Sequence, residues 1–170
     1  MSQDDVRPGG GGDYEQFKPS DAPEIWRQLN SFLRGEISAA ETYRMAIEKA
    51  LQSTSARPPD VSALRQIQQD HGRAAQALRE RIRELGGEPS DSSGAWGTWA
   101  KLNEGVANLF GDASSLKALK EGEERGLRDY EQSLDEIDLT SAELIQNQLI
   151  PTQERHITVL DQLLRAMTSA

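Results

Sequence analysis

Six residues of types that bind metal ions recur along the chain at matching spacings. Two are glutamates, and the other four form two pairs in which a histidine stands three residues after a glutamine: Glu36, Glu123, Gln68 with His71, and Gln153 with His156. Side chains three residues apart on a helix project from the same side, so each Gln-His pair can reach one central point. A carboxylate buried without a partner costs several kcal/mol, so these glutamates need a metal ion or hydrogen-bonded partners. The spacing therefore predicts one shared polar site.

The residues around these polar positions predict four long helices. Apolar residues recur at alternating intervals of four and three, the period of helices packed in a bundle. The first stripe runs through Leu29, Leu33, Glu36, Ala40, Tyr43, Ile47 and Ala50. Helices are expected over residues 21–53, 61–85, 112–138 and 140–168. Short connections after the first and third helices, and a long one after the second, predict an all-α antiparallel four-helix bundle with one crossover.

Capping and helix-breaking residues set the expected ends of these helices. N-terminal caps are expected at Asp21 with Glu24, at Asp60, and at Thr140 with Glu143. Gly86 supplies a C-terminal stop for the second helix. Pro151 interrupts the fourth helix, and a kink is expected there because the proline ring must displace the carbonyl of Asn147.

Two segments fall outside the four helices. Residues 1–20 carry four consecutive glycines and almost no apolar side chains, so we expect a disordered N-terminal tail before a bundle over residues 21–168. The crossover over residues 86–112 is too apolar for a flexible linker. We expect in it a short amphipathic helix that Trp96 and Trp99 anchor onto the bundle.

The chain also repeats a helical hairpin. Glu36 followed by Tyr43 returns 87 residues later as Glu123 followed by Tyr130, and the two Gln-His pairs match at an offset of 85 residues. Such a duplication gives a bundle an approximate twofold axis. Both tyrosines stand seven residues after a glutamate, so we expect them beside the polar site.

Composition excludes several classes of function. Nineteen basic residues against 28 acidic ones give a formal net charge of -9, which repels phosphate backbones and anionic lipid, so neither nucleic acid nor a membrane is an expected partner. The chain has no cysteine and therefore no disulfide framework or thiol nucleophile. It has no apolar stretch near the roughly 18 residues of a membrane span and no signal-peptide pattern, so cytoplasmic residence is expected. Hydrolase and kinase chemistry lack the motifs that they need.

The layout of the six polar residues resembles that of ferritin-like di-iron carboxylate bundles. A glutamate followed by a tyrosine seven residues later resembles the first-helix signature of ferritins. The long crossover between the second and third helices also resembles the ferritin arrangement. Segments such as LGGEPSDSSGAWGTWAKLNEGVANLFGD and LKALKEGEERGLRDYEQSL resemble a family of uncharacterised bacterial proteins within that superfamily. The resemblance covers residues 21–168 and implies a metal centre, with oxidase or storage chemistry if the metal is iron.

The sequence departs from the ferritin-like pattern at the bridging carboxylates. Both Glu-x-x-His motifs read Gln-x-x-His, and Glu36 and Glu123 alone balance the charge of one divalent ion. We therefore expect a single ion of iron, zinc or manganese. Its expected ligands are Glu36, His71, Glu123 and His156, with Gln68 and Gln153 as weak ligands and Tyr43 and Tyr130 next to them.

A second interpretation stays open beside the metal site. The same residues can form a metal-free buried network of Glu-His ion pairs completed by the glutamine amides, in a non-catalytic structural or stress-related protein. The sequence assigns no catalytic residue and leaves open whether the protein is an enzyme. A homodimer or a higher homo-oligomer is the expected assembly.

Overall fold

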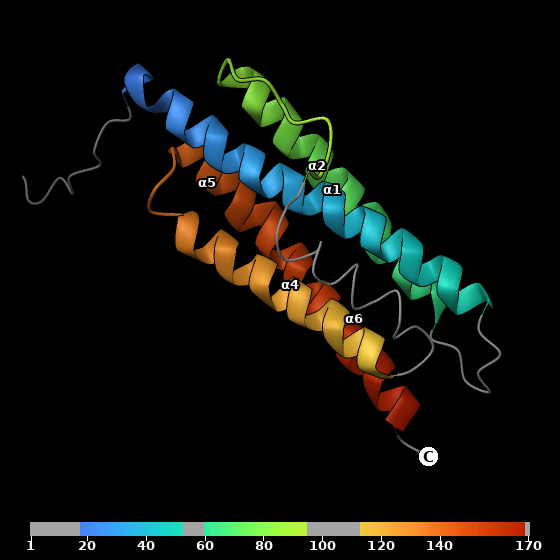
Figure 1. Ribbon diagram of the computed structural model, residues 1–170. Helices are drawn as coiled ribbons and strands as arrows, with labels where there is room; N and C mark the ends of the chain where they lie inside the picture. The colour runs from blue at the N-terminus through green and yellow to red at the C-terminus, as the bar shows by residue number, and fades with distance from the viewer. Residues whose placement is uncertain (1–17, 53–59, 95–112, 169–170) are drawn as a thin grey trace, which may run out of the picture.

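The computed structural model describes residues 18–52, 60–94 and 113–168 (Figure 1). All regular structure in these ranges is helical, as the stripes predicted. In chain order the elements are a 3-10 turn Pro19–Asp21, α1 Ala22–Gln52, α2 Val61–Glu84, α4 Ala113–Ser133, α5 Leu139–Leu144, a π-helical turn Ile145–Leu149 and α6 Ile150–Thr168. Most of the expected tail, and the expected crossover helix with Trp96 and Trp99, lie outside the described residues.

Two helical hairpins make up the bundle. α1 packs along α2, α4 packs along α6, and the two helices of each pair run in opposite directions (Figure 1). α5, the π-helical turn and α6 follow one another directly and form a single long path beside α4. None of the helices in the described ranges has the length and apolar character needed to cross a membrane.

The core consists of two apolar clusters with a polar layer between them. The first cluster includes Leu29, Leu33, Leu78, Ile82, Ile137 and Ile145. The second includes Tyr43, Ile47, Leu64, Leu116, Leu119 and Leu160. The buried polar side chains that fall between the clusters along the helices include Glu36, His71, Glu123, Gln153 and His156. The layer arises because every helix carries its polar residues near the middle of its apolar stripe.

The buried face of α1 differs from the predicted stripe at one position. Leu33 and Tyr43 are buried as expected, but Ala39 is buried where Ala40 was predicted, and Ala40 is half-buried. The predicted stripe is buried again at Tyr43, Ile47 and Ala50, so the difference is confined to these two adjacent alanines.

The ends of the first three helices follow from local capping chemistry. At the start of α2, Asp60 accepts a hydrogen bond from the backbone N–H of Ser62 at 2.9 Å, as predicted. Gly86 has a φ of 76° just after α2, a conformation that glycine adopts without strain. The helical path begins earlier than predicted, in a 3-10 turn where Asp21 accepts from the backbone N–H of Lys18 at 3.2 Å.

The predicted cap of the fourth helix is wrong by two residues. Asp138, and not Thr140, is the cap of α5, and it accepts from the backbone N–H of Ser141 at 3.1 Å. Because α4 ends at Ser133 rather than near residue 138, Asp138 is available to cap the following helix. Thr140 lies exposed in the first turn of α5.

The distortion expected at Pro151 takes the form of the π-helical turn that ends two residues before it. In this turn the backbone N–H of Ile150 reaches back five residues to the carbonyl of Ile145. A proline in a regular helix has no N–H to donate and its ring clashes with the carbonyl four residues earlier. The wider turn relieves that conflict, so the helical path continues through the proline into α6.

Candidate metal centre

His71 on α2 lies between two carboxylates. Its Nδ1 is 2.7 Å from Oε2 of Glu36 on α1, and its Nε2 is 3.0 Å from Oε1 of Glu123 on α4. All three side chains are buried. Burial by itself lowers the pKa of His71, but the negative charges of Glu123 and Glu36 outweigh it and raise this pKa from 6.5 to about 10. In the absence of a metal, His71 is therefore an imidazolium that donates to both glutamates.

Glu123 accepts hydrogen bonds from three other helices. Its Oε1 receives the hydroxyl of Tyr43 at 2.5 Å as well as His71, and its Oε2 faces the amide of Gln153 and, at 3.2 Å, Nδ1 of His156. Burial raises the pKa of Glu123, but the charge of His71 and the hydrogen bonds from both histidines lower it to about 2. Glu123 is therefore an ionised acceptor at the centre of the layer.

The two tyrosines connect the hairpins reciprocally. Tyr43 on α1 donates to Glu123 on α4, and Tyr130 on α4 donates to Glu36 on α1. Burial first, and then the neighbouring carboxylate, raises the pKa of each tyrosine well above its usual value. Both hydroxyls therefore stay protonated and act as donors, and each hairpin supplies the donor for the other hairpin's glutamate.

Asp70 on α2 contacts the layer from the side. Its Oδ2 is 3.3 Å from Nε2 of His156, and its Oδ1 accepts from Arg73 and, at 3.1 Å, from Gln66. The guanidinium of Arg155 lies 3.9 Å from Oδ2. Partial burial raises the pKa of Asp70, but hydrogen bonds from Arg73, His156 and Gln66 outweigh it and lower this pKa below its usual value. His156 thus has a carboxylate oxygen facing each of its ring nitrogens.

The structure brings five of the six predicted residues into one layer and leaves the sixth outside. Gln153 donates to Glu123, whereas Gln68 is half-buried and, among the described residues, takes no part in the hydrogen bonds of the layer. From α2, Asp70 and not Gln68 contacts His156 of the second hairpin. Sequence spacing gives no signal for Asp70, because it lies off the apolar stripe, one residue before His71.

Three side chains in this layer could together hold a metal ion. One ligand atom from each of His71, Glu123 and His156 lies within 4.8 Å of the other two, and all three residues are buried. Glu36 is not part of this group in the described structure, because it faces the opposite nitrogen of the His71 ring from Glu123. Two imidazoles and one carboxylate supply three ligands and leave coordination positions open, as in catalytic zinc sites and mononuclear iron sites.

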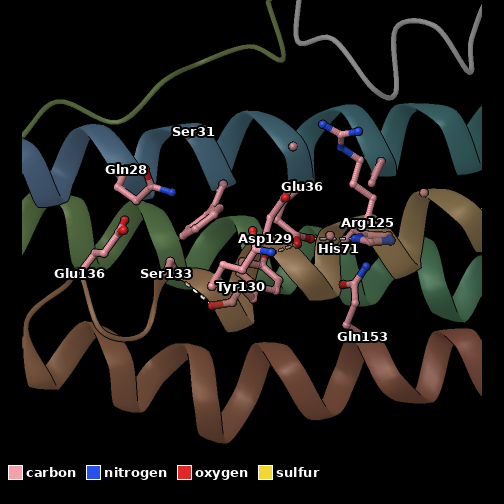
Figure 2. A pocket seen from close by; sticks show the side chains of 16 residues that line it. Gln28, Ser31, Glu36, His71, Arg125, Asp129, Tyr130, Ser133, Glu136 and Gln153 are labelled. Carbon is pink, nitrogen blue, oxygen red and sulfur yellow. Dashed lines mark hydrogen bonds and ion pairs between the residues drawn. The ribbon is translucent and has the colours of Figure 1, made fainter.

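Cavities reach the layer from different sides. A cavity of about 380 Å³ lies between α1 and α4, and Glu36, His71 and Gln153 are among the residues that line it (Figure 2). A cavity of about 270 Å³ lies between α2 and α6 and is lined by residues that include Asp70 and His156. His71 and His156 therefore each line a cavity, whereas Glu123 lines neither of these two.

This fold and this layer define a helical bundle with a buried histidine-glutamate centre. Residues 24–136, about two thirds of the chain, match the family described as "Domain of unknown function (DUF2383)", and the chain belongs to this family. The match contains Glu36, His71 and Glu123 but ends before α6, which carries Gln153 and His156. No curated protein and no solved structure matches the chain.

Proposed function

We propose that the protein binds one divalent transition-metal ion between His71, Glu123 and His156. The observation that carries this proposal is the approach of three buried ligand atoms to within 4.8 Å of one another. An ion about 2.1 Å from each ligand requires ligand atoms roughly 3.4 Å apart in a tetrahedral site. The contacts of His71 Nε2 and His156 Nδ1 with the Glu123 carboxylate, at 3.0 and 3.2 Å, are already close to that separation.

The donors of the layer favour one ion over two. Of the three proposed ligands only Glu123 carries a formal negative charge, and Glu36 already accepts from His71 and Tyr130. Gln153 offers Glu123 an amide donor where a ferritin-like site has a second carboxylate. Imidazole ligands suit zinc and ferrous iron better than manganese, so zinc or iron is the proposed metal.

Metal titration of the purified, chelator-treated protein tests the proposal. We expect isothermal titration with zinc, and with ferrous iron under anaerobic conditions, to give one equivalent per chain. Glu123→Gln removes the proposed anionic ligand and should abolish binding. Glu121→Gln is the matched control, because Glu121 is exposed on the same helix and its substitution changes the net charge equally. Two equivalents per chain, or equal binding by the two variants, would contradict a single site at Glu123.

The second candidate function is a metal-free structural bundle. It is favoured by the hydrogen bonding of the layer, because His71 as an imidazolium satisfies both glutamates without an ion. Among the described residues, the one buried side-chain atom without a partner is Oδ2 of Asp138, which lies outside this layer. Under this alternative, zinc or iron leaves the thermal unfolding of the protein unchanged, whereas a bound ion raises the unfolding temperature.

We further propose that the bundle is of the ferritin-like type and assembles as a homodimer or higher homo-oligomer. Two antiparallel hairpins joined by a long connection, with polar residues at mid-helix, support the ferritin-like assignment. Sedimentation equilibrium of the full chain, with and without zinc, tests the assembly.

A further inference from the structure

Asp70 and His156 make a contact that links the two hairpins next to the proposed ligands. They lie on α2 and α6, and Oδ2 of Asp70 is 3.3 Å from Nε2 of His156. The other ring nitrogen, Nδ1, is 3.2 Å from Oε2 of Glu123. The imidazole therefore stands between an outer carboxylate and the central one.

The surroundings of Asp70 fix which of its oxygens faces the ring. Arg73 and Gln66 both donate to Oδ1, and this leaves Oδ2 for His156. An ionised carboxylate only accepts hydrogen bonds, so the hydrogen between Oδ2 and Nε2 belongs to the imidazole. When Nδ1 binds a metal ion, the single hydrogen of the neutral His156 ring lies on Nε2, where Oδ2 of Asp70 accepts it.

That tautomer directs two electron pairs at the same point. The Nδ1 lone pair of His156 and the Glu123 carboxylate face each other across 3.2 Å, an arrangement that is repulsive unless Nδ1 takes up a proton or a metal ion lies next to both. His71 has an equivalent outer carboxylate in Glu36, at 2.7 Å from its Nδ1. Each histidine thus has one carboxylate on its outer side and Glu123 on its inner side.

We propose that Asp70 is a positioning residue that holds His156 in the Nε2–H tautomer and so presents Nδ1 to the metal ion. This inference rests on the proposed function. Outer carboxylates that accept the second N–H of a ligating histidine orient the ring and increase its basicity, and their loss typically lowers metal affinity by about 10- to 100-fold.

The test is Asp70→Asn, which keeps the shape of the side chain and replaces one acceptor oxygen with an NH₂ donor. Because Arg73 and Gln66 donate at Oδ1, the amide oxygen should take that place and turn the NH₂ group towards His156. The NH₂ group then donates to Nε2, and the ring hydrogen moves to Nδ1. Glu80→Gln is the matched control, since Glu80 is exposed on the same helix and its substitution changes the net charge equally.

The first readout is the tautomer of the metal-free protein. Nitrogen-15 spectra of the imidazoles in mildly alkaline solution distinguish protonated from unprotonated ring nitrogens, and the chain has two histidines to assign. We expect the unprotonated nitrogen of His156 to be Nδ1 in the parent and in Glu80→Gln, and Nε2 in Asp70→Asn. An unchanged tautomer in Asp70→Asn would overturn the proposal.

The second readout is the zinc dissociation constant, measured by competition with a chromophoric chelator. We expect it to rise by about 10- to 100-fold in Asp70→Asn and to stay within twofold in Glu80→Gln. Equal zinc dissociation constants for Asp70→Asn and the parent would mean that the Asp70 contact only packs α2 against α6. That result would overturn the proposal that Asp70 positions His156 for the metal ion. If the parent binds no zinc but Asp70→Asn still moves the ring hydrogen, the proposed function fails, while Asp70 is retained as the residue that sets the tautomer.

Discussion

At the scale of single residues, the polar layer depends on tyrosine hydroxyls that neutralise no charge but satisfy buried carboxylates. Glu36 accepts from His71 and Tyr130, whereas Glu123 is contacted by four side chains that can donate to it. The loss of one donor should therefore lower the free energy of unfolding more at Glu36 than at Glu123.

We predict that Tyr130→Phe destabilises the protein more than Tyr43→Phe does. A hydrogen bond to a charged group contributes about 1.5–3 kcal/mol, and a buried carboxylate left without its donor is penalised most when few donors remain. Urea unfolding of both variants, with chelator present, measures the difference in the free energy of unfolding. A larger loss for Tyr43→Phe would show that the four donors of Glu123 are not interchangeable.

The ionisation of the layer predicts how stability changes with pH in the metal-free protein. The pKa of His71 is raised from 6.5 to about 10, so its stabilising effect is fully present below pH 6.5 and is lost as the pH rises towards 10. The pKa of Glu123 is lowered from 4.5 to about 2, so its effect is present above pH 4.5 and is lost as the pH falls towards 2.

We therefore expect the urea midpoint of the chelator-treated protein to decline on both sides of the interval between pH 4.5 and 6.5. The decline just above pH 6.5 is the diagnostic part, because the two buried tyrosines, whose pKa values are raised from 10.0, add to the loss only as the pH approaches 10. A midpoint that stays constant from pH 6.5 to 10 would mean that His71 is not an imidazolium in the folded protein.

At the scale of the helices, the close approach of α4 and α6 depends on a glycine. A methyl group on Gly126 would lie 2.9 Å from Nε2 of Gln153 and would push away the amide that donates to Glu123. A methyl group on Gly72 of α2 would meet nothing within 4 Å.

We predict that Gly72→Ala stabilises the protein by about 1 kcal/mol, because alanine favours the helix over glycine. Gly126→Ala should gain less, or lose stability, in the parent and should recover the full gain in a Gln153→Ala background. A double-mutant cycle of unfolding free energies measures this coupling. Equal effects of Gly126→Ala in both backgrounds would show that Gln153 does not restrict α4.

The start of α5 depends on Asp138, which caps the helix and also accepts from Arg81 at 2.7 Å. We predict that Asp138→Ala lowers the unfolding free energy by about 1–2 kcal/mol from the cap alone. Thr140→Ala should change it by less than about 0.5 kcal/mol, because Thr140 is exposed. Thermal or urea unfolding of the two variants compares them, and a larger loss for Thr140→Ala would restore Thr140 as the cap.

The helices were predictable because burial repeats along the chain at a regular interval, and this interval places Glu36, His71, Glu123, Gln153 and His156 in one layer. Asp70 was not predictable, because its contact depends on how α6 approaches the side of α2. The same limit explains Gln68, whose type and spacing match Gln153 although its side chain does not join the hydrogen bonds of the layer. Periodicity determines which face is buried, but not which side chains at its edge meet across two hairpins.

At the scale of the whole molecule, metal binding and folding are linked through the layer that joins the hairpins. Gln153→Glu removes an amide donor and places a second carboxylate against Glu123, and the repulsion between two buried carboxylates should lower the unfolding free energy by a few kcal/mol without metal. With zinc or ferrous iron the added carboxylate becomes a ligand, so this loss should shrink or reverse.

Gln68→Glu is the control for this prediction, because it changes the net charge equally at a half-buried position outside the hydrogen bonds of the layer. Thermal melts of both variants and the parent, in chelator and in metal, give the comparison. Equal losses of stability for Gln153→Glu and Gln68→Glu in chelator would contradict the conclusion that Gln153 lies in the polar layer and Gln68 lies outside it.

Tyr43 and Tyr130 each donate a hydroxyl hydrogen bond to the glutamate of the other hairpin. This reciprocal arrangement limits how the chain can be divided into independent hairpins. Each hairpin holds a glutamate whose tyrosine donor belongs to the other half, so neither half supplies every donor that its own buried glutamate uses. A single hairpin that folded alone would expose that glutamate to water or find the tyrosine on a second copy of itself. A duplicated gene encodes both copies in one polypeptide and supplies them in a fixed one-to-one ratio. After such a fusion the two halves are free to diverge, as Asp70 and its counterpart Arg155 have done, provided that the exchanged pairs are kept.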